Sequence, residues 1–482
     1  MPASEAPSIV WLRQDLRLAD NPALHAALSS KRPLLLLFVL DDETPGRWSV
    51  GGASKWWLHR SLDALQRDIE KIGGRLILRR GNAERVILDL VAETGAEAVF
   101  WNRCYEPYAI KRDSAIKERL RTAGVSAESF NSALLHEPWT IKTKTGEPFK
   151  VFTPFWRACQ PLETRSLLTR PKTLPAWRGA LQSEALESWA LLPTKPNWAL
   201  HFEPQWRPGE SGAHAALSAF IDGALKDYPS GRDQLGQRGT SRLSPHLHWG
   251  EISPVQVRAA VQSATAEDPR LQASADKFMS EIGWREFSHH LLFHWPTIAE
   301  QNWRSQFDAF PWRDDDEALE AWRRGRTGYP VVDAAMRELW VTGYMHNRAR
   351  MIAASFLIKH LLIDWRRGED WFWDTLLDAD LANNAASWQW VAGSGADASP
   401  YFRIFNPVTQ GERYDADGAY VRRWLPELAH VPDAFIHKPW EAPTLVLKEA
   451  GVVLGETYPA PIVDHAAARA LALEAFAAIK GS

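Results

Sequence analysis

The sequence predicts an α/β plus all-α protein, in which an N-terminal parallel α/β domain is joined by a long connector to a helical C-terminal domain. Three observations favour this fold class. The chain has 482 residues, more than one hydrophobic core usually supports, and its 45% hydrophobic content is enough for two cores. The first 135 residues alternate β-rich runs with amphipathic stretches. From about residue 206 onward the pattern is helical without strand alternation.

Four short apolar runs near the N-terminus are typical of buried parallel strands. They are SIVWL (8–12), PLLLLFVL (33–40), RLILRR (75–80) and AVFWNR (98–103). An amphipathic stretch follows each run, as in a parallel, Rossmann-like sheet. Asp20, Asn21 and Pro22 predict a helix start, because Asn or Asp caps helices and proline is favoured in the first turn. No Gly-x-Gly-x-x-Gly follows the first run, which disfavours a nicotinamide dinucleotide but leaves room for another ligand at the carboxyl ends of the strands.

The remaining chain divides into a connector and a helical part. Residues 136–205 are rich in proline and tryptophan with poor periodicity, so we expect a long inter-domain connection. Helical patterns then cover 276–295, 331–362, 370–390 and 464–479. The expected domains are therefore 1–135, 136–205 and 206–482.

Composition excludes several classes of protein. Cys104 and Cys159 are too few for a disulfide framework or an iron–sulfur cluster, so we expect a reducing compartment and no such metal site. The longest apolar run, 34–40, is too short to span a bilayer, and we expect a cytoplasmic protein without a membrane partner. The formal net charge of −3 gives no global attraction to nucleic acid, so any such binding must come from a local basic patch.

Tryptophan is used unusually often, with 25 Trp against 9 Tyr and 19 Phe. An indole adds a large π-face, an N–H donor and ready one-electron oxidation to what Phe or Leu could supply. Stacking on a ligand and electron transfer are the two uses that this excess indicates.

One segment, 378–390 (DADLANNAASWQW), combines carboxylates, amides and indoles in a stretch that otherwise looks built for burial. Asn384 and Trp388 are four residues apart and would share a face of a helix. A buried carboxylate without a partner costs several kcal/mol. Asp378 and Asp380 should therefore face a cation, a hydroxyl-rich ligand or water.

Three further segments carry binding chemistry. Residues 240–244 place two hydroxyls and an arginine before Ser244-Pro245, which we expect to cap a helix and to suit a phosphate, although a plain capped helix is the alternative. Glu281, Trp284 and Arg285 have the spacing of one helix face, and so do Asn347 and Met351.

Taken in order, these segments resemble the photolyase/cryptochrome family over nearly the whole chain. The matching motifs are 11–18 (WLRQDLRL), 240–245, 284–287 (WREF), 345–351, 378–390 and 401–411 (YFRIFNPVTQG). The resemblance implies an N-terminal α/β domain, a connector and a helical domain that holds FAD in a folded conformation.

The resemblance also assigns residues to the flavin. Those matching its contacts are Tyr228, Thr240, Ser241, Arg242, Leu243, Ser244, Phe278, Arg285, Arg350, Asp378, Asp380 and Asn384. In the family pattern Asp378 pairs with Arg350, and Asn384 faces flavin N5. Plant cryptochromes carry an Asp there that can deliver a proton, whereas an amide cannot, so the sequence favours repair over signalling.

Two further sets follow from the resemblance. Trp388, Trp365 and Trp312 match a three-indole chain that re-reduces the flavin under light, and with Glu281 and Asn384 they are the residues expected to act in the reaction. The expected contacts to damaged DNA are Glu281, Trp284, Asn347, Arg348, Met351, Trp390 and Gln410. The implied activity is light-dependent repair of cyclobutane pyrimidine dimers by electron transfer from excited reduced flavin, with UV-damaged DNA as partner and no metal.

Several alternatives stay open. The first is a cryptochrome-type blue-light photoreceptor; the second is a (6-4) photolyase, disfavoured because only His346 stands where that group has a histidine pair. A preference for single-stranded DNA is a third, and a purely structural protein fits least. His289, His290 and His294 are expected to pack within a helix. Segments 51–62 and 102–113 resemble those of bacterial photolyases related to plant cryptochromes, which implies methenyltetrahydrofolate as antenna chromophore, with a deazaflavin as alternative. We expect a monomer.

Overall fold

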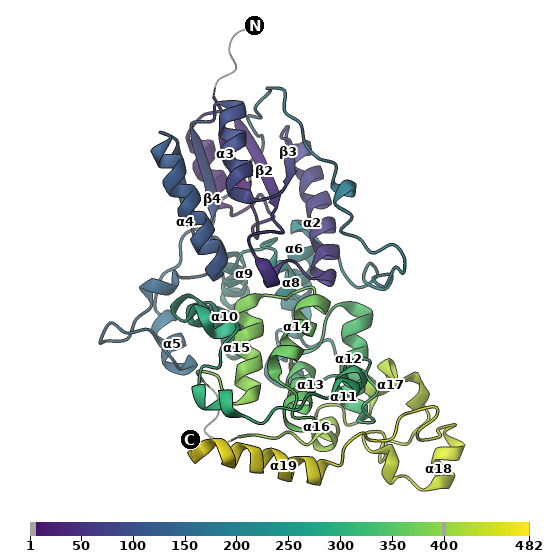
Figure 1. Ribbon diagram of the computed structural model, residues 1–482. Coiled ribbons are helices and arrows are strands. Elements are labelled where there is room, and N and C mark those ends of the chain that lie inside the picture. Colours follow the sequence, from purple (N-terminus) through teal and green to yellow (C-terminus); the bar gives the residue numbers. More distant parts are fainter. Residues whose placement is uncertain (1–5, 398–401, 482) are drawn as a thin grey trace. The chain divides into compact units, whose positions relative to one another are not determined.

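The computed structural model describes residues 6–397 and 402–481, and it shows two compact units (Figure 1). Unit 1 contains the chain up to Gly223 together with Ser241–Pro296 and Leu377–Ala382. Unit 2 contains Ala224–Thr240, Thr297–Leu376 and the chain from Asn383 onward. The chain therefore passes repeatedly from one unit to the other. Each unit is built from separate stretches of the chain, whereas the predicted domains are continuous, so the predicted boundaries at 135 and 205 stay a prediction.

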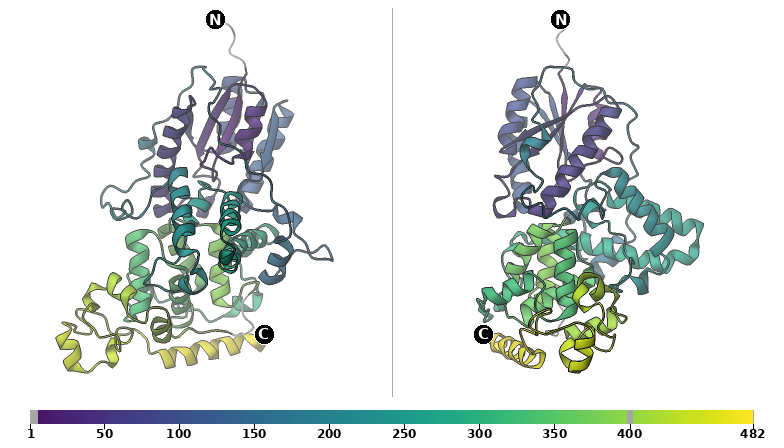
Figure 2. Two further views of the ribbon diagram at one scale, coloured as in Figure 1. Left: turned by 180° about the vertical axis from the view of Figure 1, so that it is seen from behind. Right: turned by 90° about the vertical axis from the view of Figure 1, so that its right-hand side faces the viewer.

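Unit 1 contains a five-stranded parallel sheet with the order β3-β2-β1-β4-β5. The strands are β1 Ser8–Leu12, β2 Leu34–Leu40, β3 Leu76–Arg80, β4 Ala98–Asn102 and β5 Ser126–Phe130. Ile9 of β1 pairs with Leu35 of β2 on one side and with Val99 of β4 on the other. The parallel α/β fold predicted from the sequence is confirmed, and Figure 2 shows helices on both faces of the sheet.

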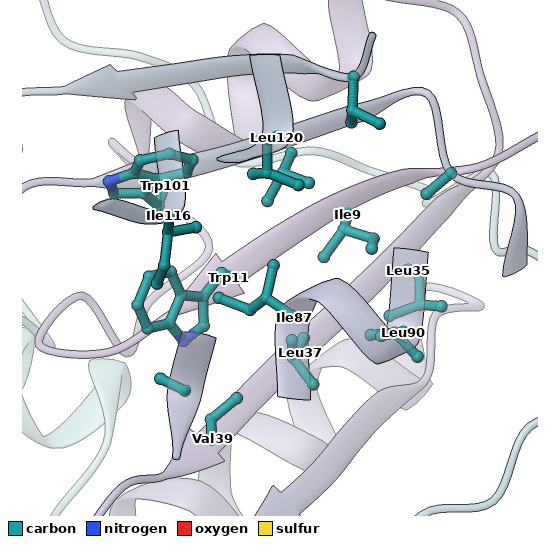
Figure 3. Close-up of a cluster of buried hydrophobic side chains, with 14 of the residues drawn as sticks. Ile9, Trp11, Leu35, Leu37, Val39, Ile87, Leu90, Trp101, Ile116 and Leu120 are labelled. Atoms are coloured by element: carbon teal, nitrogen blue, oxygen red, sulfur yellow. The ribbon is translucent and has the colours of Figure 1, made fainter. Parts of the chain in front are cut away.

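Alternate residues of the inner strands form a continuous core under two helices. Ile9, Trp11, Leu37 and Trp101 are almost completely buried against apolar side chains of α3 (Ala83–Thr94) and α4 (Pro107–Thr122), as Figure 3 shows. Strands buried on both faces explain the continuous apolar runs in the sequence. The predicted cap of the first helix is also confirmed, because Asn21 accepts a hydrogen bond from the backbone N–H of Leu24 and Pro22 opens α1 (Pro22–Ser29).

Strand β5 is not among the predicted strands. Its sequence, SAESF, is mostly polar and has only one buried residue, Ala127. It lies at an edge of the sheet and pairs only with β4. An edge strand needs no apolar run, so its sequence carried no strand signal.

The other helices of unit 1 follow the sheet. They are α2 Gly52–Lys71, α5 Phe152–Cys159, α6 Glu210–Ala219, α8 Ser244–His248, α9 Pro254–Glu267 and α10 Gln272–His294. Helix α5 falls within the segment expected to be a connector, and α10 matches the helix predicted at 276–295. A capping box of Ser253 and Gln256 begins α9.

Within the described residues, unit 2 consists of helices and loops and contains no strand. Its helices are α7 Tyr228–Gly231, α11 Asp316–Arg323, α12 Pro330–Thr342, α13 Asn347–Lys359, α14 Trp365–Thr375, α15 Leu381–Ala392 (whose first two residues fall in unit 1), α16 Pro407–Tyr414, α17 Ala419–Trp424, α18 Thr444–Glu449 and α19 His465–Ala478. Helix α19 is long and straight (Figure 2). Its Ala472 and Ala475 belong to one buried apolar cluster with Phe307 and Phe310.

Two predicted helical stretches are each broken into two helices. The stretch 331–362 divides at Gly343, whose left-handed φ of 66° ends α12. The stretch 370–390 divides after Thr375, and α15 begins at Leu381. The non-helical residues between α14 and α15 include Asp378 and Asp380, so neither carboxylate belongs to a helix.

Candidate functional site

Asp380 is a buried carboxylate in unit 1 that faces two imidazoles. Its side chain lies 3.5 Å from Nε2 of His289 and 3.6 Å from Nδ1 of His248. Burial opposes ionisation, yet His289 and His248 outweigh it and hold the pKa of the Asp380 carboxyl well below its usual range. Asp378, two residues earlier, is also buried. Asp380 is therefore an ionised acceptor, suited to a hydroxyl or N–H donor of a ligand.

The two imidazoles are site residues that the sequence did not single out. His289 does more than pack within α10, because it faces Asp380 while its Nδ1 lies 3.1 Å from the carbonyl of Arg285. Burial lowers the pKa of His289. Its position four residues after Arg285 was the available signal, since that spacing puts both on one face of a helix.

The segment before α8 in unit 1 has an unusual backbone. Arg242 has a left-handed φ of 53°, and its guanidinium lies 4.0 Å from the ring centroid of Trp206. The prediction that Ser244 caps the helix is wrong: Leu243 occupies the cap position, Ser244 is the first helical residue, and its side chain is exposed. Ser241 is half-buried, and its Oγ accepts from the N–H of Leu243 at 3.4 Å.

Helix α10 carries four of the predicted residues in unit 1. The indole of Trp284 stacks on Phe152 of α5, with ring centroids 3.8 Å apart and planes 10° apart. Glu281 pairs with Lys277 at 3.1 Å, and Phe278 packs against Phe220. Helix α5 therefore supports Trp284, a role that its sequence did not reveal. The fourth residue is Arg285, whose guanidinium donates to the carbonyl of Ala133 at 2.6 Å.

The first turn of α13 in unit 2 brings three predicted DNA contacts together. The amide nitrogen of Asn347 lies 3.9 Å from the sulfur of Met351, and a guanidinium nitrogen of Arg348 lies 3.7 Å from the same sulfur. Arg348 also pairs with Asp233 at 3.0 Å and lies over the ring of Tyr414 at 4.5 Å. Asp233 and Tyr414 are neighbours that the sequence did not indicate.

Three other predicted residues of unit 2 have separate surroundings. Tyr228 is buried, with the guanidinium of Arg232 at 5.6 Å from its ring. Thr240 is half-buried. The Nε of Arg350 donates to the carbonyl of Met345 at 2.8 Å. Asp378 belongs to unit 1 and Arg350 to unit 2, and their expected pairing stays a prediction.

Asn384 and Trp388 lie one turn apart on α15, which confirms that they share a helix face. The side-chain amide of Asn384 is buried and donates to the carbonyl of Glu369 at 3.1 Å, which fixes its orientation. The indole of Trp388 packs against Phe372 at 4.9 Å and Trp322 at 6.3 Å. Trp390 and Gln410 are half-buried on α15 and α16, and Tyr401 lies outside the described residues.

The three indoles of the predicted chain differ in burial. Trp388 and Trp365 are buried, and Trp365 donates its N–H to the side chain of Asn302 at 3.0 Å. Trp312 is half-buried and packs against Phe310 at 4.4 Å. This order from interior to surface is compatible with the electron path, which stays a prediction.

These groups fit the cofactor that the sequence implies. In unit 1, Asp380 offers a buried ionised acceptor and Arg242 a cation; in unit 2, Asn384 offers a buried, oriented amide. Flavin, ribityl and phosphate groups present donors, acceptors and negative charge in turn, so this donor set suits FAD.

Comparison with known proteins covers both parts of the chain. The family described as "DNA photolyase" matches residues 8–176, and the "FAD binding domain of DNA photolyase" matches residues 278–478. A deoxyribodipyrimidine photo-lyase from Agrobacterium fabrum is 55% identical over 100% of this chain and 99% of that protein. The chain belongs to the photolyase/cryptochrome family.

Both a cryptochrome and a further photolyase are among the proteins to which the chain is similar. Cryptochrome-2 of Arabidopsis thaliana is 42% identical over 97% of this chain and 78% of its own length. The crystal structure of a bacterial class III photolyase from Agrobacterium tumefaciens superposes with a TM-score of 0.95, at 54% identity, covering 99% of this chain and 98% of that one. The family assignment and the fold predicted from the sequence are thereby confirmed, and the chain carries an FAD-binding domain.

Among the residues that the structure describes, no helix is both long and apolar enough to cross a membrane. Within the same residues, no group of three His, Cys, Asp or Glu side chains is placed to hold a metal ion.

Proposed function

We propose that this protein repairs cyclobutane pyrimidine dimers in DNA in a light-dependent reaction. The observation that carries the proposal is the convergence of Asn347 and Arg348 on the sulfur of Met351 in the first turn of α13. An amide can read the edge of a pyrimidine, a thioether packs on its ring and a guanidinium attracts a phosphate. The named activity of the 55% identical relative agrees with this combination.

The dimer must leave the duplex to be reached, at a cost of a few kcal/mol that is lower for a damaged base. Trp284 and Trp390 are the proposed aromatic walls around it, and Glu281 and Gln410 are proposed polar contacts. Phe152 keeps the Trp284 ring in one orientation by stacking on it. Phosphate contacts such as Arg348 should give steep salt dependence, while discrimination should depend on the walls.

FAD, when bound in its reduced form, supplies the photo-excited electron that opens the dimer and accepts it back, so the reaction has no net redox change. The proposed protein contacts are the twelve residues assigned above by resemblance. Among them Asn384 is an amide that carries no titratable proton, and its bond to the Glu369 carbonyl holds it in one orientation. Trp388, Trp365 and Trp312 are proposed to deliver electrons for re-reduction.

The direct test is a repair assay with a thymine-dimer oligonucleotide and purified, flavin-loaded protein, illuminated or kept dark. We expect dimers to disappear only in the light and only when the flavin is reduced. Equal dimer content in both arms contradicts the proposal. Running the assay with single- and double-stranded substrates also settles strand preference.

A blue-light photoreceptor is the second candidate, because plant cryptochromes are 41–42% identical to this chain. Such a protein would show light-dependent partner binding with no loss of dimers. A (6-4) photolyase has less support. His346 caps α13 by accepting from the N–H of Arg348, and burial lowers its pKa to about 4, so it is neutral at physiological pH.

We also propose a second, light-harvesting chromophore, with methenyltetrahydrofolate favoured over a deazaflavin by the resemblance of segments 51–62 and 102–113. A 28% identical archaeal photolyase from Sulfolobus tokodaii is described with two FAD molecules, with the implication of a novel light-harvesting cofactor. The absorption spectrum of the purified protein distinguishes these chromophores. Gel filtration tests the proposed monomer.

A further inference from the structure

Helix α13 carries a stripe of four side chains at four-residue spacing, each about one turn from the next. Asn347 and Met351 begin this stripe and are proposed dimer contacts, and Ser355 and Lys359 continue it. Ser355 and Lys359 are buried, with 1% and 3% of their surface exposed. A buried ammonium group costs several kcal/mol unless it is well paired, so Lys359 needs a structural or functional reason.

The two buried residues of this stripe, Ser355 and Lys359, contact the segment 402–405. Nζ of Lys359 donates to the backbone carbonyl of Arg403 and lies 4.5 Å from the ring of Phe402. Oγ of Ser355 accepts from the N–H of Phe405 at 3.4 Å. Two side chains one turn apart therefore hold two backbone groups of the same short segment.

The held segment borders the end of α15, where Trp390 lies. A pocket of about 20 Å³, enough for about one water molecule, is lined by Ser355, Lys359, Trp390, Val391, Gly393, Arg403 and Phe405. Gly393 has a φ of +92°, and a β-carbon there would lie 3.4 Å from Phe402. The left-handed backbone at this position favours glycine, and Phe402 of the segment lies within van der Waals distance of it.

We infer that Lys359 and Ser355 are positioning residues that hold segment 402–405 against Trp390, and so keep this indole ready to pack on a pyrimidine dimer. The inference rests on the proposed function, because Trp390 is assigned to the dimer by resemblance. Desolvation lowers the pKa of Lys359 to about 7, as expected for an amine buried away from water.

The test compares Lys359→Met, Ser355→Ala, Trp390→Ala and the double variant Lys359→Met/Trp390→Ala in flavin-loaded protein. Methionine has a similar length and no charge, and replacing a buried ion by an apolar side chain is often neutral for folding. The measurements are the Kd for a thymine-dimer oligonucleotide, the Kd for the undamaged oligonucleotide, and the repair yield per absorbed photon at saturating dimer. Lys448→Met, at an exposed lysine of α18, is the matched control.

We expect Lys359→Met to weaken dimer binding about tenfold, within the range that one aromatic stack on a base contributes, with the Kd for undamaged DNA and the saturated repair yield unchanged. Ser355→Ala should produce a smaller loss of the same kind. In the Trp390→Ala background the effect of Lys359→Met should vanish.

Equal losses for dimer and undamaged DNA, or additive losses in the double variant, overturn the inference. Failure of the proposed function is distinguishable, because the unsubstituted protein would then show no preference for the dimer at all. If Lys359→Met does not fold, the test is made with Ser355→Ala, by comparing its Kd for the dimer-containing oligonucleotide with its Kd for the undamaged one.

Discussion

Gly368 of α14 lies directly against the indole of Trp388, because a β-carbon at Gly368 would be 2.1 Å from Cη2 of that ring. No side chain larger than hydrogen fits there without a shift. The close approach of α14 to α15 at this point therefore fixes where the first indole of the proposed electron chain sits.

Gly368→Ala should displace Trp388 and slow photoreduction of the flavin, because electron transfer is steeply sensitive to distance. Overpacking of this kind also costs about 1–3 kcal/mol of stability. The decay of oxidised-flavin absorbance under illumination measures the effect. Gly223→Ala, where a β-carbon meets nothing within 4 Å, is the matched control. Photoreduction at the unsubstituted rate would show that the position of Trp388 does not matter.

Trp388→Phe should abolish photoreduction while leaving flavin bound, because Phe preserves an aromatic contact with Phe372 but is far harder to oxidise. Flavin absorbance after gel filtration measures retention, and illumination with an external donor measures reduction. Repair by chemically reduced protein should stay normal. Trp198→Phe, which alters an indole packed on Phe202, should change neither quantity. Retained photoreduction in the Trp388 variant rejects its assigned role.

Asp233→Asn should weaken dimer binding roughly fivefold, or about 1 kcal/mol, because the Asp233 carboxylate holds the Arg348 guanidinium at 3.0 Å in a partly exposed ion pair. A binding titration with a dimer-containing oligonucleotide measures the change, and Asp222→Asn, at an exposed residue, serves as control. In an Arg348→Gln background the Asp233 substitution should have no further effect. An undiminished effect in the Arg348→Gln background would mean that Asp233 does not act through Arg348.

Glu286→Gln should flatten the dependence of stability on pH. Burial raises the pKa of the Glu286 carboxyl to about 7 from an ordinary value of 4.5. Between these pH values the folded state keeps a proton that the unfolded state releases. The contribution of Glu286 to the free energy of unfolding should therefore fall as pH rises and level off above about 7, by about 3 kcal/mol in all. Glutamine can still accept from the N–H groups of Leu135 and His136.

The measurement for this variant is the midpoint of thermal unfolding from pH 5 to pH 8. Between pH 5 and pH 8, Glu286→Gln should lose less stability, or gain more, than the unsubstituted protein. Glu300→Gln, at an exposed glutamate, should keep the original slope. Parallel curves for all three proteins would mean that Glu286 ionises normally in the folded state.

The sequence predicted the sheet because β1, β2 and β4 are buried on both faces and read as continuous apolar runs. It missed β5, whose edge position places no such demand on composition. It also joined helices that Gly343 and the residues after Thr375 separate. Periodicity continues across a short break, because the next helix resumes a buried face.

The candidate site was predictable where one segment carries its own spacing, as for Asn384 and Trp388 or for Asn347 and Met351. Its supporting residues were not. His248 lies 132 positions before Asp380, and Asp233 lies far from Arg348 in the chain, so only the fold brings each pair together. Stacking of Phe152 on Trp284 is hidden for the same reason, since α5 has weak sequence signals.

The interleaved course of the chain affects how the protein can be synthesised and divided. Leu377–Ala382 complete unit 1, although they follow eighty residues of unit 2 in the chain, Thr297–Leu376. A ribosome must therefore translate most of the message before the last residues of unit 1 are available. Truncated fragments ending before this point should aggregate or recruit chaperones, and splitting the protein into two separately expressed halves should require both pieces to associate while folding.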